Sequence, residues 1–378
     1  MKRVTIGLIG LGYIGKIHAI AYRSIPLCFD APEVKPRLRA LLRHQVETVE
    51  AAQETTAFEV VTSDPDVFFG QDLDVVDICT PNFLHREQAR QALESGAAVY
   101  CEKPLSDSLE GARAMAALAE AQGAVTHVAF VLRYLPAVRQ MKTLVGEDVI
   151  GDILHFRSYM HHGGYLNPSR PMSWRLRHRE SGGGAFMDLG IHLVDLVHYV
   201  LGPVVNVRGA ARTFVRERPV AVGSAEREPV DVDDWGLCTM ALRGGAVGTI
   251  EVTRMAAGAG GATGLELHGR RGSLIFRAND PRRVRWYDLE TGRWTEVGGE
   301  EAGQPGERPL SQIFPSGKYS QGYSTDIHMA SAYDFLLDVV GANQSKPDFR
   351  DGLAAQRVTE AFYRSAAADG SAVDLSEM

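Results

Sequence analysis

The sequence predicts a doubly wound α/β domain with a parallel sheet, followed by an α+β domain built on a large, mostly antiparallel, open-faced sheet. Up to about residue 125, short apolar runs alternate with longer amphipathic stretches. Beyond about residue 150, most runs look like strands joined by glycine-rich or charged turns. Repeated strand–helix units build a parallel sheet, whereas consecutive strands build an antiparallel one. We therefore expect two domains, 1–128 and 129–378.

The bulk composition restricts the class of protein. A chain of 378 residues exceeds what a single core usually supports, which agrees with two domains. The net charge of −7 does not favour nucleic acid or anionic membranes as partners. We find no signal-peptide pattern and no long apolar run, so we expect neither a membrane partner nor secretion. The four widely spaced cysteines predict no metal cluster or disulfide, and hence the cytoplasm.

In the first domain, the apolar runs lack polar alternation, as expected for a parallel sheet that is buried on both faces. The expected strands are Val4–Ile9, Arg39–Leu42, Val75–Cys79 and Ala97–Tyr100, and the expected helices are Ile14–Arg23, Glu47–Gln53, Leu84–Glu94 and Leu109–Ala121.

In the second domain, helices are the exception. The expected strands are Asp152–Met160, Val204–Phe214, Val232–Leu242, Ala246–Thr253, Gly264–Leu267, Ser273–Phe276, Arg283–Tyr287 and Trp294–Val297. The expected helices are Leu189–Leu201, Tyr323–Val340 and Leu353–Ala367, and we expect the last two to pack back against the first domain. Residues 298–321 combine glycine, proline, serine and charge, which predicts a long surface loop.

The turn Gly10-Leu11-Gly12-Tyr13-Ile14-Gly15 follows the first strand and opens a helix. In that context GxGxxG is the dinucleotide fingerprint of a Rossmann domain. Gly10 permits a tight turn, Gly12 lets the pyrophosphate approach the backbone, and Gly15 permits close packing of helix on strand. The N-terminus of the helix then offers N–H groups and positive potential to the phosphates. The alternative is a purely structural turn.

The end of the second strand usually carries an Asp or Glu that holds the adenine ribose of NAD. Here the residues are Arg43 and His44. An arginine at this place can hold a 2′-phosphate, which favours NADP, but it can equally stack on adenine or face solvent. The choice between NAD and NADP stays open.

Glu102-Lys103-Pro104 directly follows a buried strand and so lies at the carboxyl edge of the sheet, where ligands bind. An ammonium group there could stabilise negative charge on a reacting oxygen. The alternative is an ordinary surface lysine.

Asp188 and His192 follow the glycine run Gly182–Gly184 and share one face of a predicted helix. Such a pair suits proton transfer, although it is also common without any catalytic role, and Asp188 could instead cap the helix. We interpret the glycine run as flexible backbone bordering a ligand.

Taken together, these segments resemble the Gfo/Idh/MocA family of oxidoreductases over essentially the whole chain. The resemblance is carried by GLGYIG (Gly10–Gly15), TPNFLH (Thr80–His85), EKP (Glu102–Pro104), SWRLRHRESGGGAFMDLGIHLVDL (Ser173–Leu196), ELHGRRGSL (Glu266–Leu274) and DGLAAQRVTEAFYRSA (Asp351–Ala366).

The resemblance implies an N-terminal Rossmann domain and a C-terminal sheet that often forms the oligomer interface, so we expect a homodimer or homotetramer. It also implies roles for individual residues. Lys103 lies beside the nicotinamide and the substrate hydroxyl, His192 is the general acid/base, and Asp188 is its partner. The remaining contacts that the resemblance implies are Thr80, Pro81, Asn82 and His85 toward the cofactor, and Arg133, Trp174 and Arg175 toward the substrate. From the residues themselves we expect Glu102 to contact the cofactor and Tyr165, in the loop after His161 and His162, to contact the substrate.

The expected function is therefore NAD(P)-dependent hydride transfer at a secondary alcohol or ketone of a sugar, inositol or other polyol. One alternative is a redox-neutral enzyme that cleaves glycosides or epimerises sugars with a bound dinucleotide. Another is a non-catalytic, dinucleotide-sensing regulator. We expect no metal: His161 and His162, adjacent on a strand, would point to opposite faces. Asp326 and His328 either reach the pocket or cap a late helix.

Overall fold

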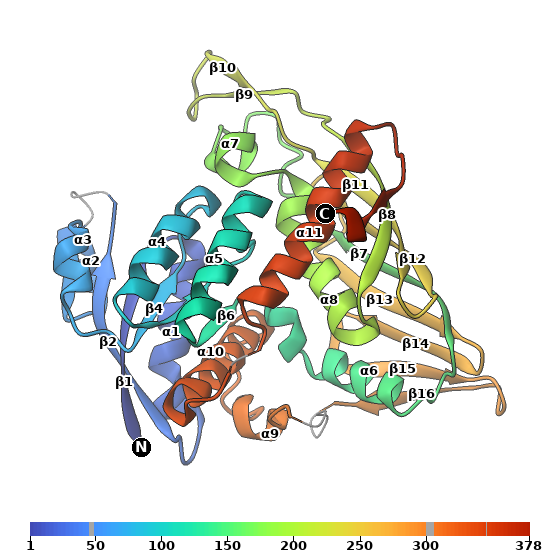
Figure 1. Ribbon diagram of the computed structural model, residues 1–378, viewed down its shortest axis with the longest axis horizontal. Coiled ribbons are helices and arrows are strands. Elements are labelled where there is room, and N and C mark those ends of the chain that lie inside the picture. Colours follow the sequence, from blue (N-terminus) through green and yellow to red (C-terminus); the bar gives the residue numbers. More distant parts are fainter. Residues whose placement is uncertain (45–48, 300–305, 345) are drawn as a thin grey trace. The chain divides into compact units, whose positions relative to one another are not determined.

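The computed structural model describes residues 1–44, 49–299, 306–344 and 346–378. The chain forms two compact units, coloured along the sequence in Figure 1. Unit 1 combines Met1–Tyr134 with Leu310–Leu353, and unit 2 combines Leu135–Pro309 with Ala354–Met378. Each unit has its own sheet.

Unit 1 is a parallel sheet with helices connecting its strands. Its strands are β1 (Lys2–Ile9), β2 (Val34–Leu42), β3 (Val60–Thr62), β4 (Val75–Ile78), β5 (Ala98–Cys101) and β6 (Thr126–Val128). Its helices are α1 (Tyr13–Cys28), α2 (Val49–Thr55), α3 (Pro65–Phe69), α4 (Asn82–Glu94), α5 (Leu109–Gln122), η2 (Val131–Tyr134), α9 (Leu310–Ile313), α10 (Tyr323–Gly341) and the beginning of α11 (Phe349–Ala367).

The six strands have the order β3-β2-β1-β4-β5-β6, and every adjacent pair is parallel. All carboxyl ends therefore lie at one edge of the sheet. The chain order reverses between β1 and β4, which is where dinucleotides bind in such sheets. The glycine turn follows β1, Thr80 follows β4 and Glu102 follows β5, so the topology brings these three loops to that edge.

The strands and long helices predicted for this unit are confirmed, but several short elements were missed. β3 and β6 have three residues each, too few for a periodic signal. The predicted helix Glu47–Gln53 lies partly outside the described residues, and the structure describes α2 from Val49. α1 continues five residues beyond the predicted end, through Pro26.

Unit 2 is a nine-stranded sheet in the order β16-β15-β14-β13-β7-β12-β11-β8-β17, with a separate β9–β10 hairpin. The strands are β7 (Ile153–His161), β8 (Val204–Arg212), β9 (Glu217–Pro219), β10 (Arg227–Pro229), β11 (Trp235–Leu242), β12 (Val247–Thr253), β13 (Ala262–Gly269), β14 (Gly272–Arg277), β15 (Asp280–Asp288), β16 (Arg293–Gly298) and β17 (Val373–Asp374). The helices are α6 (Pro136–Gly146), η3 (Trp174–Leu176), α7 (His178–Ser181), the π-helical turn η4 (Phe186–Gly190), α8 (Ile191–Leu201), the remainder of α11 and η5 (Leu375–Glu377).

This sheet is antiparallel except between β7 and β12. Burial alternates along its strands: in β11, Cys238 and Met240 are buried, whereas Thr239 is exposed. Helix α6 packs against β15, and η4 packs against β12. These helices therefore cover one face of the predicted large, mostly antiparallel sheet, and among the described residues side chains such as Thr239 are exposed on the other.

Two strand predictions in unit 2 were too long for the same reason. β11 begins at Trp235 rather than Val232, and β8 ends at Arg212 rather than Phe214. Asp234 Oδ2 accepts the N–H groups of Phe214 and Val215, which turns both segments out of the ladder.

Residues 298–321 were predicted to be a loop, and positions 300–305 of it lie outside the described residues. The described part includes one helical turn, α9. Also against expectation, one helical run among the described residues, His178–Leu201, is long and apolar enough for a membrane span by length and composition. Of its most apolar window, 72% is buried inside the protein, as for a core helix.

Candidate active site

The glycine turn has the geometry that the fingerprint predicts. Gly10 has a φ of +90°, which favours glycine. A Cβ on Gly15 would lie 2.2 Å from the carbonyl oxygen of Gly10, so only glycine lets α1 pack against the turn. A Cβ on Gly12, in contrast, would meet nothing within 4 Å. Packing thus explains Gly10 and Gly15, while Gly12 leaves an open space beside the backbone.

That open space fits a pyrophosphate. Gly12 is the N-cap of α1 and Tyr13 is its first residue. A helix leaves the N–H groups of its first turn without intrahelical partners and carries positive potential at this end. Backbone and field together form an anion cradle.

At the end of β2, Arg43 N–H donates to Thr62 O at 2.8 Å, which joins this corner to β3. The Arg43 side chain is half-buried and His44 is exposed. These are the described residues directly after β2, and neither is acidic.

The Glu-Lys-Pro corner follows β5 as predicted. Lys103 N–H donates to Glu102 Oε2 at 3.2 Å, and the Lys103–Pro104 peptide is cis. His85 ties this corner to the loop after β4: its Nδ1 lies 3.0 Å from Pro104 O and its Nε2 lies 2.9 Å from Thr80 O. Burial lowers the pKa of His85 despite these contacts. The neighbouring Asn82 is also buried. His85 therefore links the two loops predicted to flank the nicotinamide.

A buried polar cluster beneath this corner was missed by the sequence analysis. His18 Nδ1 lies 2.9 Å from Asp77 Oδ2, and its Nε2 lies 3.3 Å from Glu102 Oε1. Tyr22 O–H donates to Asp77 Oδ2 at 2.9 Å. The available signal was Asp77 itself, a lone carboxylate in the otherwise apolar run VVDIC.

Two groups of three residues in this cluster have ligand atoms within 4.8 Å of one another: His18–Asp77–Cys79 and His18–Glu102–His328. Both use His18. From the sequence, Asp326 and His328 were expected either to reach the pocket or to cap a late helix. Asp326 accepts from Ser320 Oγ at 2.5 Å and from Gln321 N at 2.9 Å, so it anchors the start of α10, whereas His328 belongs to the cluster.

In unit 2, Asp188 lies in the π-helical turn η4 and His192 lies in the first turn of α8. Asp188 is therefore not a helix cap. Its Oδ2 lies 3.0 Å from Nη2 of Arg254, which also donates to Gly184 O at 3.1 Å. Burial alone would lower the pKa of Arg254, but the nearby carboxylate of Asp188 and the Tyr165 phenol raise it above its ordinary value. Insertions of π-helical geometry often mark functional sites.

The glycine run before η4 is not flexible, which corrects our interpretation. Gly184 N–H donates to Asp233 Oδ1 at 2.8 Å, and Phe186 N–H donates to Asp233 Oδ2 at 2.9 Å. A Cβ on Gly184 would lie 2.0 Å from Asp233 O, and one on Gly183 would lie 2.4 Å from Tyr363 Oη. Gly183 and Gly184 are required because the Tyr363 side chain and the Asp233 backbone, respectively, leave no room for a Cβ.

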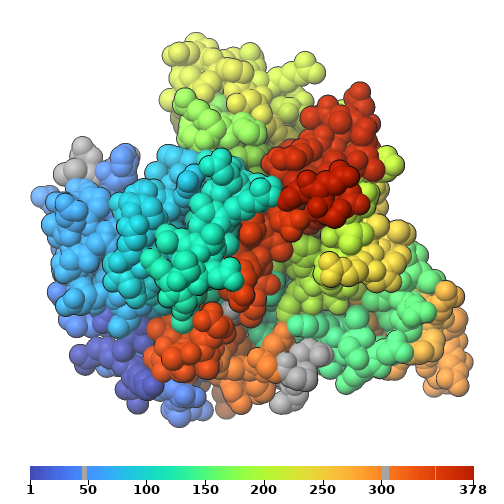
Figure 2. Space-filling view, viewed as in Figure 1, coloured from blue at the N-terminus to red at the C-terminus, as the bar shows by residue number. Residues whose placement is uncertain are grey.

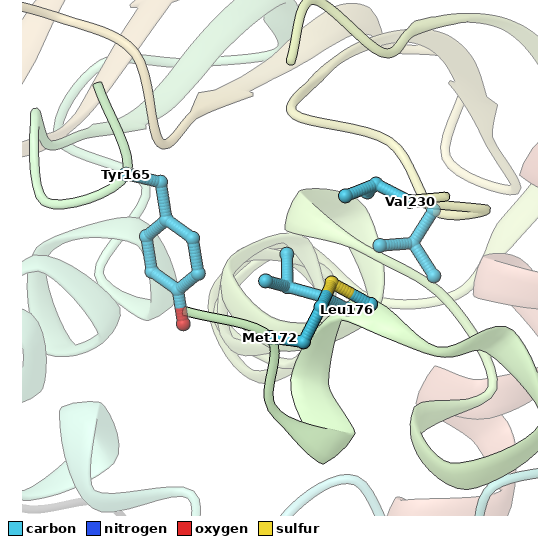
Figure 3. Close-up of a cluster of buried hydrophobic side chains, with 5 residues drawn as sticks. Tyr165, Met172, Leu176 and Val230 are labelled. Carbon is cyan, nitrogen blue, oxygen red and sulfur yellow. The ribbon is translucent and has the colours of Figure 1, made fainter. Parts of the chain in front are cut away.

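The predicted substrate contacts occupy different environments. Tyr165 packs in a small cluster with Met172, Leu176, Val230 and Val232 (Figure 3), and the Arg254 guanidinium lies 4.7 Å from its ring centre. The Arg175 guanidinium lies 4.3 Å from the ring centre of Trp174, and this pair is more exposed.

Arg133, in unit 1, is buried, and its guanidinium lies 3.3 Å from Asp351 Oδ1. His161 ends β7, with its Nε2 3.6 Å from Glu251 Oε2, and His162 lies beyond the strand.

Known families match both units. Residues 4–130 match the oxidoreductase family with an NAD-binding Rossmann fold, and residues 138–275 match the GFO/IDH/MocA C-terminal domain. The chain therefore belongs to the GFO/IDH/MocA family of NAD-binding oxidoreductases, which confirms the resemblance.

Individual relatives extend over the whole chain. Levoglucosan dehydrogenase of Pseudarthrobacter phenanthrenivorans is 31% identical over 399 residues and covers 100% of both chains. Inositol 2-dehydrogenase of Rhizobium meliloti is 26% identical over 367 residues, covering 96% of this chain and 97% of the relative. A solved levoglucosan dehydrogenase in complex with NADH and levoglucosan has a TM-score of 0.89 at 31% identity, covering 99% of this chain and 100% of that one.

Proposed function

We propose that this chain is an NAD(P)-dependent dehydrogenase that transfers hydride between a nicotinamide and a secondary alcohol or ketone of a sugar, inositol or other polyol. The observation that carries the proposal is the anion cradle at Gly12, in a member of this family that also has Lys103, Asp188 and His192. A regulator that only senses dinucleotides would need the cradle but none of these three side chains.

The relatives support the substrate class. Two of the relatives are named for levoglucosan and inositol. Both compounds are ring polyols with neighbouring secondary hydroxyl groups. The relative named for levoglucosan aligns along its full length. We therefore place anhydrosugars first among the candidate substrates and inositols second.

Three side chains divide the chemistry at the substrate. When bound, the nicotinamide supplies the hydride acceptor or donor. The Lys103 ammonium donates a hydrogen bond to the reacting oxygen and stabilises the negative charge that develops there. His192 takes the hydroxyl proton on oxidation and returns it on reduction. Asp188, held by Arg254, orients the imidazole or the substrate.

Unit 1 supplies the cofactor site in this proposal. Its cofactor contacts are Gly10, Gly12, Tyr13, Ile14, Gly15, Arg43, His44, Thr80, Pro81, Asn82, His85, Glu102 and Lys103. Arg43 follows β2 at the position where an acidic residue would select NAD, so we propose that Arg43 admits the 2′-phosphate of NADP alongside NAD.

Unit 2 supplies the proposed substrate contacts, which are half-buried Trp174, exposed Arg175 and buried Tyr165. Arg133 of unit 1 remains a proposed substrate contact.

We further propose that the open face of the nine-stranded sheet forms a homodimer or homotetramer. Its exposed side includes Thr239 and half-buried Leu237. Size-exclusion chromatography with light scattering measures the assembly. The four cysteines are buried and free, which fits the reducing cytoplasm.

The test is a panel of levoglucosan, other anhydrosugars, inositols and aldoses, each with NAD⁺ and NADP⁺, followed by the absorbance of the reduced nicotinamide. We expect turnover with at least one ring polyol. A flat panel with both nucleotides would contradict the proposal. Substrate conversion on tightly bound cofactor, without net reduced nucleotide, would instead support the redox-neutral alternative.

A further inference from the structure

Asp77 is an unusual residue for the middle of a central strand. It lies on β4 and its side chain is inaccessible to solvent. A buried carboxylate is costly unless charged or hydrogen-bonding groups surround it. Tyr22 O–H supplies one hydrogen bond, and His18 Nδ1 lies within 2.9 Å of one carboxylate oxygen and 3.1 Å of the other.

The second nitrogen of the same imidazole faces a second carboxylate. His18 Nε2 lies 3.3 Å from Glu102 Oε1, and both residues are buried. A neutral imidazole carries one N–H, so it would turn a lone pair toward one of the two carboxylates. An imidazolium carries a proton on both nitrogens, so it hydrogen-bonds Asp77 and attracts the Glu102 carboxylate, whose Oε1 lies at 3.3 Å without hydrogen-bond geometry.

The surrounding charges agree with the imidazolium. Burial alone would lower the pKa of His18, but Asp77 and then Cys79 raise it well above its ordinary value. Burial alone would raise the pKa of Glu102, but His18 and then Lys103 lower it to about 2. The other groups that face His18 are Tyr22, Tyr100 and His328.

Glu102 contacts both His18 and the backbone of the next residue, Lys103. Its Oε1 faces His18, and its Oε2 accepts the backbone N–H of Lys103 at 3.2 Å. The order Asp77–His18–Glu102–Lys103 therefore runs from the centre of the sheet to the backbone of Lys103.

We propose that His18 is a positioning residue: its imidazolium clamps Glu102 to Asp77 and thereby sets the backbone from which Lys103 reaches the reacting oxygen. The consequence for turnover rests on the role proposed above for Lys103. The protonation state of His18 does not.

The same atoms offer one competing explanation. The ligand atoms of His18, Glu102 and His328 lie within 4.8 Å of one another, a set that could hold a metal ion. An imidazolium has no lone pair with which to bind a metal. The two explanations therefore exclude each other.

The first experiment reads the imidazole directly by NMR of the protein labelled with ¹⁵N-histidine, assigned by a His18→Gln spectrum. We expect both His18 nitrogens to carry protons at neutral pH. His85 and His328 serve as internal controls, because burial lowers the pKa of both and they should be neutral. A neutral His18, or a stoichiometric metal found by elemental analysis of the purified protein, would overturn the proposal.

The second experiment compares two isosteric variants. The amide of His18→Asn can replace Nδ1 toward Asp77, and the amide of His18→Gln can replace Nε2 toward Glu102. If His18 acts through Glu102, kcat should fall about 10-fold more in His18→Asn than in His18→Gln, while the Kd for nucleotide changes little. If His18 has only a structural role, the variant with the lower unfolding temperature should also have the lower kcat, whichever of the two it is.

A double-mutant cycle closes the test. Glu102→Gln combined with His18→Asn should lower kcat no further than the worse single variant, because both break the same contact. Thr126→Val is the control; it removes a different buried hydrogen bond, from Phe349 N–H to Thr126 Oγ1 at 3.3 Å, and its effect should add to that of Glu102→Gln. Additive losses for His18 and Glu102 would overturn the positioning role. If the wild type turns over no polyol, the proposed function fails, and the NMR result still decides the state of His18.

Discussion

The carboxylate of Asp188 lies 3.0 Å from the guanidinium of Arg254, a side chain that is 1% exposed. The pairing gives Asp188 a fixed orientation. It also connects the π-helical turn to the end of β12, because the same Nη2 donates to Gly184 O. In the proposed mechanism, Asp188 therefore orients a partner and His192 carries the proton.

Replacing Arg254 by Gln should destabilise the protein more than breaking an exposed ion pair does. A buried pair that loses one partner leaves an unpaired charge, and Asp188 is 28% exposed, so we expect a loss on the order of 2 kcal/mol. Arg177→Gln is the matched control: it breaks the Arg177–Glu228 pair, whose side chains are 26% and 33% exposed, and should cost less than about 1 kcal/mol. Urea unfolding measures both variants, and equal losses would contradict a structural role for the Arg254 pair.

Gly12→Ala and Gly15→Ala should fail in different ways. The new methyl group at position 12 enters open space, so the protein should unfold at nearly the wild-type temperature but bind nucleotide at least ~10-fold more weakly. At position 15 it meets the Gly10 carbonyl oxygen at 2.2 Å, and the protein should lose stability, by about 1–3 kcal/mol. Calorimetry of unfolding and nucleotide titration separate the two. Unchanged affinity in Gly12→Ala would place the pyrophosphate elsewhere.

Lys103→Met should separate chemistry from cofactor binding. The ammonium is needed for the charge that develops on the reacting oxygen, so kcat should fall by ~10² or more, with the Kd for nucleotide nearly unchanged. Lys35→Met, at an exposed lysine on β2, should retain wild-type turnover. Steady-state kinetics and nucleotide titration decide the outcome, and wild-type turnover in Lys103→Met would remove the lysine from the mechanism.

The stability that Glu102 contributes should depend on pH in the acid range. Its pKa falls from 4.5 in the unfolded chain to about 2 in the fold, so its contribution is complete above pH 4.5 and is lost as the pH falls toward 2. The advantage of the wild type over Glu102→Gln in urea unfolding should therefore shrink by about 2 kcal/mol between about pH 6 and pH 3. A constant difference over that range would mean that Glu102 has an ordinary pKa.

Much of the site could be predicted from motifs, because each motif lies at the end of a strand whose position follows from the fold. The glycine turn and Lys103 are such cases. The points where β8 ends and β11 begins, near Asp233 and Asp234, could not be predicted. These two carboxylates accept hydrogen bonds from backbone N–H groups of segments distant in sequence.

Buried partners were the hardest to predict. His18 and Asp77 are 59 residues apart, and neither shows in its own segment that the other completes it. Arg254 likewise follows the end of a strand, where any polar residue is common, so the sequence does not indicate its contact with Asp188. Tertiary packing beneath the surface that Figure 2 shows determines these buried pairs, whereas periodicity in the sequence reports only which face of an element is buried.

Transfer of a labelled hydride tests the central claim most directly. Levoglucosan deuterated at every carbon, or the best polyol from the panel in the same form, would be incubated with the wild-type protein and NAD⁺ or NADP⁺. Mass spectrometry of the reduced nucleotide should find one deuterium per nicotinamide, because the hydride comes from the carbinol carbon. Reduced nucleotide without deuterium, or no reduced nucleotide with any ring polyol, would contradict the account.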